Sequence, residues 1–160
     1  MRWDLDQVAE PIAYKLLAAT VMPRPIAWVV TQNKQGNLNA APYSFFNVMG
    51  SAPPTIVLGL MADPARGFKD TAANILATGE FVVNLVPEAL VQQMNTTAVD
   101  APTGVNELDL AGLETLPSKH ICPPRIATSP VAFECRMLSS VVTGPHQTIV
   151  IGRVLAVHID

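Results

Sequence analysis

The sequence predicts a mainly β protein with inserted helices, in which an antiparallel sheet closes into a small β-barrel. Three observations favour this fold class: about six segments have the composition of strands, turn residues separate several of them, and helical patterns lie between them. A barrel is an economical closure for such antiparallel strands. The 160 residues suit a single domain, 1–160, that can bury a sizeable core.

The first predicted unit is a β-hairpin. Residues 25–31 (Pro-Ile-Ala-Trp-Val-Val-Thr) are rich in β formers, and residues 33–37 (Asn-Lys-Gln-Gly-Asn) supply the turn that reverses the chain into residues 38–41. The Ala-Pro-Pro sequence at 52–54 then stops the chain. The almost continuously apolar residues 55–60 indicate a buried strand after it.

Two helices are predicted around the next strand. Residues 70–77 are mostly good helix formers, and Gly79 is placed to end that helix. Residues 81–86 return to a strand pattern. We expect residues 87–98 to form a second helix, with Pro87 in its first turn.

The last third of the chain begins with a long excursion. Residues 99–130 contain five prolines and few periodic hydrophobic residues, so we expect little regular structure beyond a helical turn or two near residues 105–108. Two long strands then close the fold, at residues 131–142 and 147–159, joined through residues 143–146.

The amino-acid composition limits which partners and which cellular location we expect for the protein. Apolar residues make up 49% of the chain and charged residues only 14%, against about 25% in an ordinary soluble domain, which predicts a surface covered by a partner subunit. The net charge of −3 and the lack of a basic run argue against nucleic acid. The acidic start does not fit a signal peptide, and no apolar run reaches the about 20 residues that span a bilayer. We expect a cytoplasmic protein that does not enter the membrane.

No metal site is predicted. Cys122 and Cys135 lack metal-ligand spacing, and His120 and His158 have no companions at such spacing. We interpret both cysteines as reduced thiols.

Two segments together have the composition of a flavin cradle. Residues 39–47 (Asn-Ala-Ala-Pro-Tyr-Ser-Phe-Phe-Asn) offer small residues, polar side chains and backbone amides to a flat heterocycle. Residues 66–71 (Arg-Gly-Phe-Lys-Asp-Thr) place basic groups and a hydroxyl at a helix start, which suits a phosphate. Each segment also has an ordinary interpretation, as core aromatics beside a strand and as a solvated helix start.

Five segments, in this order and spacing, resemble the flavin reductase-like family of FMN-binding split barrels over nearly the whole chain. The segments are residues 24–29, 39–47, 69–71 with Asn74, 79–84 and 144–146. The resemblance implies a Greek-key split barrel, a homodimer, and FMN near the dimer interface. Similar proteins usually continue beyond the final strand, so the resemblance implies that a C-terminal segment is lacking after Asp160.

The resemblance also implies the cofactor-binding residues. It places Lys69, Asp70 and Thr71 around the phosphate, with Arg66 as an addition. The residues that it places around the ring and the ribityl chain are Thr31, Asn39, Ala41, Tyr43, Ser44, Phe45 and Asn47. His146 falls where many such reductases have Gly-Asp-His near the nicotinamide, but Pro145 replaces the aspartate here. His146 is therefore our candidate catalytic residue, and its ordinary interpretation is a residue that stabilises the turn.

These observations predict an FMN-dependent oxidoreductase, an NAD(P)H:flavin reductase in which NADH or NADPH delivers hydride to flavin N5. Flavin performs that chemistry itself, so the protein needs no strong acid–base constellation. Two alternatives stay open at this point. Pro145 and the short C-terminus favour an FMN-binding electron carrier without turnover of its own, and the apolar composition alone fits a dimeric interaction module.

Overall fold

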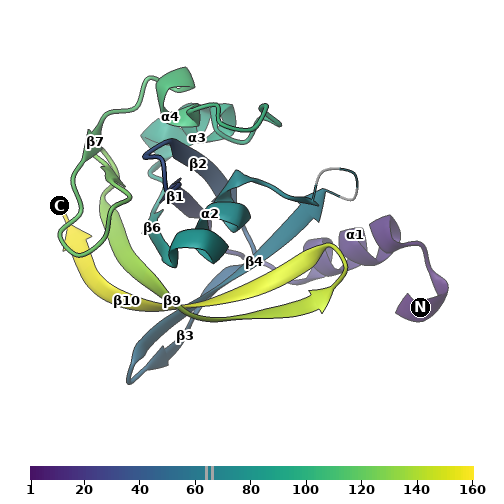
Figure 1. The fold of residues 1–160 in the computed structure, drawn as a ribbon. Helices are drawn as coiled ribbons and strands as arrows, with labels where there is room; N and C mark the ends of the chain where they lie inside the picture. The colour runs from purple at the N-terminus through teal and green to yellow at the C-terminus, as the bar shows by residue number, and fades with distance from the viewer. Residues whose placement is uncertain (64, 66) are drawn as a thin grey trace.

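The computed structural model describes residues 1–63, 65 and 67–160 (Figure 1). The helical elements are η1 (Leu5–Gln7), α1 (Glu10–Thr20), α2 (Asp70–Thr78), η2 (Glu88–Leu90), α3 (Val91–Thr96) and α4 (Glu107–Leu110). The strands are β1 (Ala27–Gln32), β2 (Leu38–Tyr43), β3 (Phe46–Ser51), β4 (Pro54–Asp63), β5 (Gly67–Phe68), β6 (Glu80–Asn84), β7 (Thr115–Leu116), β8 (Arg125–Ile126), β9 (Val131–Gly144) and β10 (Gln147–Ile159).

Over the described residues, the main sheet has eight strands in antiparallel pairs. Seven of them follow the order β2-β1-β6-β9-β10-β4-β3, and β5 pairs with β4. β2 and β3 are consecutive in the sequence but lie at opposite ends of this order. The chain passes between them through Ser44 and Phe45, and the Gly59 N–H of β4 donates to the Phe45 carbonyl at 2.7 Å. The sheet therefore curls into the barrel that the sequence predicted.

The hydrophobic core has two layers, one on each face of β1. Ala27 and Val29 pack inside the barrel with residues of α2, β4 and β6, whereas Trp28 and Val30 pack on the outside. Burial on both faces explains why this strand is almost continuously apolar. In Figure 1, α2 lies inside the curl of the sheet, and α3 and α4 lie beyond β1 and β2. Leu108 of α4 joins the outer layer.

Most predicted elements are confirmed, but the structure also differs from the prediction, and β3 and β5 are strands that the sequence did not predict. The first hairpin, α2 and the two long strands are present, and Gly79 ends α2 with φ 73°, which favours glycine. Residues 87–98 are not one helix, because Leu90, the last residue of η2, departs from helical geometry before α3 begins. The excursion at 99–130 contains the small β7–β8 sheet, and α1 had not been predicted.

α1 lies at the periphery of the molecule and buries none of its residues (Figure 1). Arg24 ties its C-terminal end to the barrel, because the guanidinium donates to the carbonyls of Ala18 and Val21 and also to the Ser44 hydroxyl. The Tyr14 ring lies 6.0 Å from the Phe45 ring, centroid to centroid. Within the described part of the chain, no helix is both long and apolar enough to cross a membrane.

Candidate functional site

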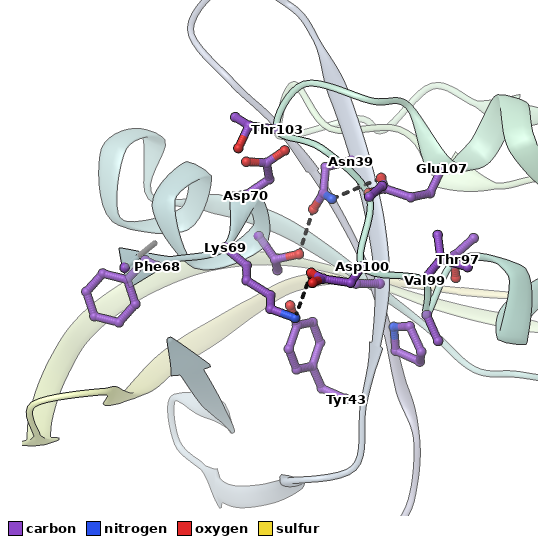
Figure 2. A pocket seen from close by; sticks show the side chains of 16 residues that line it. Asn39, Tyr43, Phe68, Lys69, Asp70, Thr97, Val99, Asp100, Thr103 and Glu107 are labelled. Atoms are coloured by element: carbon purple, nitrogen blue, oxygen red, sulfur yellow. Dashed lines mark hydrogen bonds and ion pairs between the residues drawn. The ribbon is translucent and has the colours of Figure 1, made fainter. Parts of the chain in front are cut away.

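The predicted cradle segments meet at two adjoining cavities. The first, which we call the inner cavity, has a volume of about 180 Å³ and lies between β2, the start of α2 and residues 97–107 (Figure 2). The second, the outer cavity, has a volume of about 380 Å³ and includes Ser44, Phe45 and Gly59 in its lining. Both cavities are lined by Pro42, Tyr43 and Lys69, so they form one groove along the end of β2.

Lys69 stands at the junction of the two cavities. It is the N-cap residue of α2 and has extended backbone geometry, so the first amide groups of the helix follow it directly. Its ammonium group lies 3.2 Å from a carboxylate oxygen of Asp100, across the inner cavity (Figure 2). A cation beside a helix N-terminus is a favourable arrangement for a bound anion.

A buried polar network forms one wall of the inner cavity. The Thr71 hydroxyl donates to the Asn39 side-chain oxygen at 2.6 Å, and the Thr31 hydroxyl lies 3.3 Å from the same atom. The Asn39 amide group and the Ala40 N–H both donate to the Glu107 carboxylate at 3.0 Å (Figure 2). Thr31, Asn39 and Thr71 therefore bond within the protein and shape the wall of the cavity.

Tyr43 keeps its proton at neutral pH. Burial raises the pKa of its phenol, the contact with the Thr71 side chain acts in the opposite direction, and the carboxylates of Glu107 and Asp70 raise the pKa further. Tyr43 and Lys69 both line the two cavities. A neutral phenol at the junction of the two cavities can donate a hydrogen bond to a ligand oxygen.

The outer cavity is built around the Ser44–Phe45 connection. Phe45 is fixed from one side by Gly59, where a Cβ would come within 2.9 Å of the Phe45 Cβ. The Arg24 guanidinium lies 5.9 Å from the Phe45 ring centroid, which is within the range of a cation–π contact. The Ser44 hydroxyl accepts a hydrogen bond from Arg24 at 3.3 Å.

The remaining predicted residues lie in different places. Ala41 lines the inner cavity, and the Asp70 carboxylate, which also lines it, accepts the Gly104 N–H at 2.9 Å. Asn47 lines neither of these two cavities but a third one of about 410 Å³, which shares Ser44, Phe45 and Gly59 with the outer cavity, and its side chain accepts the N–H of Val48. Arg66 lies outside the residues that the structure describes.

His146 lies in the turn between β9 and β10, at the rim of the groove. His146 is not among the described residues that line the inner and outer cavities. Its carbonyl accepts the Ala62 N–H at 2.7 Å, and Ala62 itself lines the outer cavity. The turn is therefore held against the outer cavity through its backbone.

The prediction from sequence missed two residues that complete the inner cavity. Glu107 is buried in α4, where the surrounding Glu-Leu-Asp-Leu sequence resembles an exposed helical turn. Asp100 lies in a segment without periodicity, so nothing in its neighbours linked it to Lys69. Residues this far apart in the sequence meet only when the excursion folds over β2.

The chain belongs to the family described as flavin reductase like domain, whose family model matches residues 19–160. It is 44% identical over 158 residues to an uncharacterized protein of Deinococcus radiodurans, and the match covers 96% of this chain and 69% of that protein. An uncharacterized protein of Aquifex aeolicus is also 44% identical over 124 residues, 78% of this chain and 63% of that relative.

Two solved structures are similar over nearly the whole chain. Nitrilotriacetate monooxygenase component B from Bacillus cereus superposes with a TM-score of 0.95 at 33% identity, over 99% of this chain and 81% of its own. The 2-nitrobenzoate 2-nitroreductase of Pseudomonas fluorescens has a TM-score of 0.89 at 32% identity, over 100% of this chain and 77% of its own. The predicted family and the split-barrel fold are confirmed, and the chain is a flavin-related oxidoreductase of that family.

Proposed function

We propose that this chain binds FMN in the groove and acts, as a homodimer, as an NAD(P)H-dependent flavin reductase. The observation that carries the proposal is the pair of adjoining cavities, one with a cation at a helix N-terminus and the other with aromatic and small residues. A phosphate attached to a flat ring needs this combination. The combined size of the two cavities falls within the range of about 300–1,000 Å³ that is usual for ligand sites.

The residues present fit FMN as follows. Lys69 and the first amide groups of α2 hold the phosphate, and Thr71, bonded to Asn39, supports that wall from behind. Tyr43 donates to an oxygen of the ribityl chain, because its phenol is neutral and lies at the junction. Ser44 and Phe45 border the ring.

Bound flavin supplies the redox chemistry, by accepting hydride at N5. The protein binds the ring and keeps it in one orientation. The contacts of Phe45 with Gly59 and with the Arg24 guanidinium hold its ring in place, and this ring borders the flavin. His146, on the turn beside Ala62, reaches over the rim and donates to the carboxamide of NADH or NADPH.

A second copy of the chain covers an exposed apolar face in this proposal. Large hydrophobic side chains are exposed on β3, β9 and β10, and they are Val48, Met49, Leu138, Val141, Val142 and Ile149. Among them, Val141 and Ile149 are register partners and share one face of the sheet. The cavity of about 410 Å³ that contains Asn47 opens among them, with Met49 and Ile149 in its lining. A face of this kind is typical of an interface between subunits.

Titration with FMN tests binding, and we expect saturation at one FMN per subunit, followed by quenching of tryptophan fluorescence. Failure to bind micromolar FMN would contradict the proposal. Anaerobic mixing of the FMN complex with NADH or NADPH tests turnover, and we expect the visible flavin absorption to bleach.

Binding without bleaching by either nucleotide would instead support the alternative function, an FMN-binding electron carrier. One observation favours that alternative: within the described residues, His146 is not part of the groove lining, and it follows Pro145 in place of an aspartate. The experiment with both nucleotides therefore separates the two functions.

A further inference from the structure

The ion pair between Lys69 and Asp100 spans the opening of the inner cavity. The Lys69 ammonium and an Asp100 carboxylate oxygen are 3.2 Å apart, and both side chains are about half exposed, at 53% and 58%. Figure 2 shows Lys69 extending from the start of α2, above Tyr43, toward Asp100. The cation that suits a phosphate is thus already engaged by a carboxylate of the same chain.

Most of the charged side chains that line the inner cavity are acidic, within the part of the chain that the structure describes. Among the described residues that line the inner cavity, Lys69 supplies a positive charge, whereas Asp70, Asp100 and Glu107 supply carboxylates. Asp70 accepts the Gly104 N–H, and Glu107 accepts the Ala40 N–H, so both acids hold the fold together. Asp100 is the acid that contacts the lysine.

The loop that carries Asp100 is anchored on both sides of it. Before Asp100, the buried Thr97 hydroxyl accepts a hydrogen bond from the Trp28 indole N–H at 2.8 Å. After it, the Gly104 N–H donates to Asp70 at 2.9 Å. Neither anchor uses the Asp100 side chain, so a change there leaves both of them in place.

We propose that Asp100 determines specificity between phosphorylated and unphosphorylated flavins, because it competes with the phosphate of FMN for Lys69. This inference rests on the proposed function. A phosphate that binds at Lys69 must displace the carboxylate from the ammonium and remain near its negative charge. Riboflavin, which has no phosphate, leaves the ion pair intact. Asp100 therefore lowers the affinity for FMN and has little effect on the affinity for riboflavin.

The test is a fluorescence titration of FMN and of riboflavin, at low ionic strength, into the parent protein and the variant Asp100→Asn. We expect the variant to bind FMN roughly 5- to 20-fold more tightly, since a repulsive charge near a dianion is removed at a partly exposed position. Riboflavin affinity should change less than about twofold. Added salt should reduce the difference between the two proteins for FMN.

The matched control is Asp6→Asn, which removes the same charge at an exposed position in η1 and should change neither affinity. Unchanged or weaker FMN binding by Asp100→Asn overturns the inference, and so does an equal gain for both flavins. If Asp100→Asn fails to show a cooperative unfolding transition, Asp100→Ser replaces it under the same criteria. If none of these proteins binds either flavin, the proposed function fails as well, which distinguishes that outcome from the failure of the inference alone.

Discussion

Lys69 occupies its position because the chain enters α2 directly from β5 at the mouth of the groove. The helix begins at Asp70, and the side chain of its N-cap residue, Lys69, makes no capping hydrogen bond, which leaves the first amide groups available to an anion. Thr71 and Asn39 have a structural role. They bond to each other in the buried network and hold β2 against α2.

At the scale of single residues, the first prediction concerns Lys69→Ala. The variant should bind FMN more weakly by about 1.5–3 kcal/mol, because it loses a charge-assisted contact with the phosphate. Riboflavin binding should hardly change. Titrations of both flavins measure this, with Lys15→Ala on the exposed face of α1 as the control. An equal loss for the two flavins would show that Lys69 does not contact the phosphate.

A second residue-scale prediction concerns His146→Ala. Hydride transfer depends on positioning rather than on proton abstraction, so the rate of flavin reduction by NAD(P)H should fall roughly 10-fold, on the order of 1.4 kcal/mol in the barrier. FMN affinity should stay nearly the same, because the residue lies at the rim and not in the lining. Stopped-flow absorbance gives the rate. A variant as fast as the parent would assign His146 to the turn alone.

The sequence located much of the candidate site but not its inner wall. Residues 39–45 and 69–71 carry a recognisable order of small, aromatic and polar residues, and they line the groove or support it. Glu107 and Asp100 come from the irregular excursion, and their partners depend on how it folds over β2. Neither the local composition nor the spacing of residues in the sequence shows which partners Glu107 and Asp100 contact.

Among the elements, β9 holds the excursion to the barrel through one buried carboxylate. Glu134 is fully buried and accepts the backbone N–H groups of Lys119 and His120, both at 2.7 Å. It also contacts His158 Nε2 at 2.7 Å. Burial acts to raise the pKa of Glu134, but these hydrogen bonds outweigh it, and the pKa is lowered overall.

We therefore expect Glu134→Gln to destabilise the protein by about 1–3 kcal/mol at pH 7, since an amide cannot accept all three donors. The folded-state pKa lies below the ordinary value of 4.5, so the carboxylate's contribution to stability is complete above that value. It is lost as the pH falls below it. Urea unfolding from pH 7 to pH 3 should show the difference shrinking. The exposed Glu88→Gln should show no such difference at pH 7.

Gly152 provides a test of packing between β10 and β6. It lies at a register shift between β9 and β10, and a Cβ there would come within 2.6 Å of the Phe81 ring, which is fully buried. Gly152→Ala should lower the free energy of unfolding by about 1–3 kcal/mol, because the ring has no free space to move into. Gly144→Ala, whose Cβ would meet nothing closer than 3.4 Å, is the matched control. Equal stabilities in thermal unfolding would contradict this account.

Element prediction succeeded where periodicity was clear. The six predicted strands and α2 have regular patterns and distinct end signals, and the structure confirms them, whereas β3 and β5 were not predicted. The sequence did not predict α1. This helix buries none of its residues, so it needs no apolar stripe that a periodic pattern would show, although Pro11 in its first turn was an available signal. The two-residue strands β7 and β8 are too short to leave a pattern.

For the whole molecule, we predict an obligate homodimer with an interface that exceeds about 2,000 Å². Light scattering on dilute protein should give twice the mass of the chain. Val141→Glu places a charge on the proposed apolar face beside Ile149, where the side chain is 46% exposed, and should yield monomers. Leu110→Glu on α4, also exposed at 56%, should leave the mass unchanged. A monomeric parent protein that still binds FMN would show that the site is complete in one subunit.

The position of β10 in the sheet has a consequence for how the chain is made. β10 is the last strand in the sequence, but it pairs with β4 on one side and β9 on the other, in the middle of the strand order. A nascent or proteolysed chain that ends before residue 147 contains all the other strands yet leaves both neighbours of β10 with unpaired edges. Such edges are templates for association between chains. We therefore expect loss of this strand to lead to aggregation rather than to a smaller folded domain, because the barrel is complete only when β10 has been added between β4 and β9.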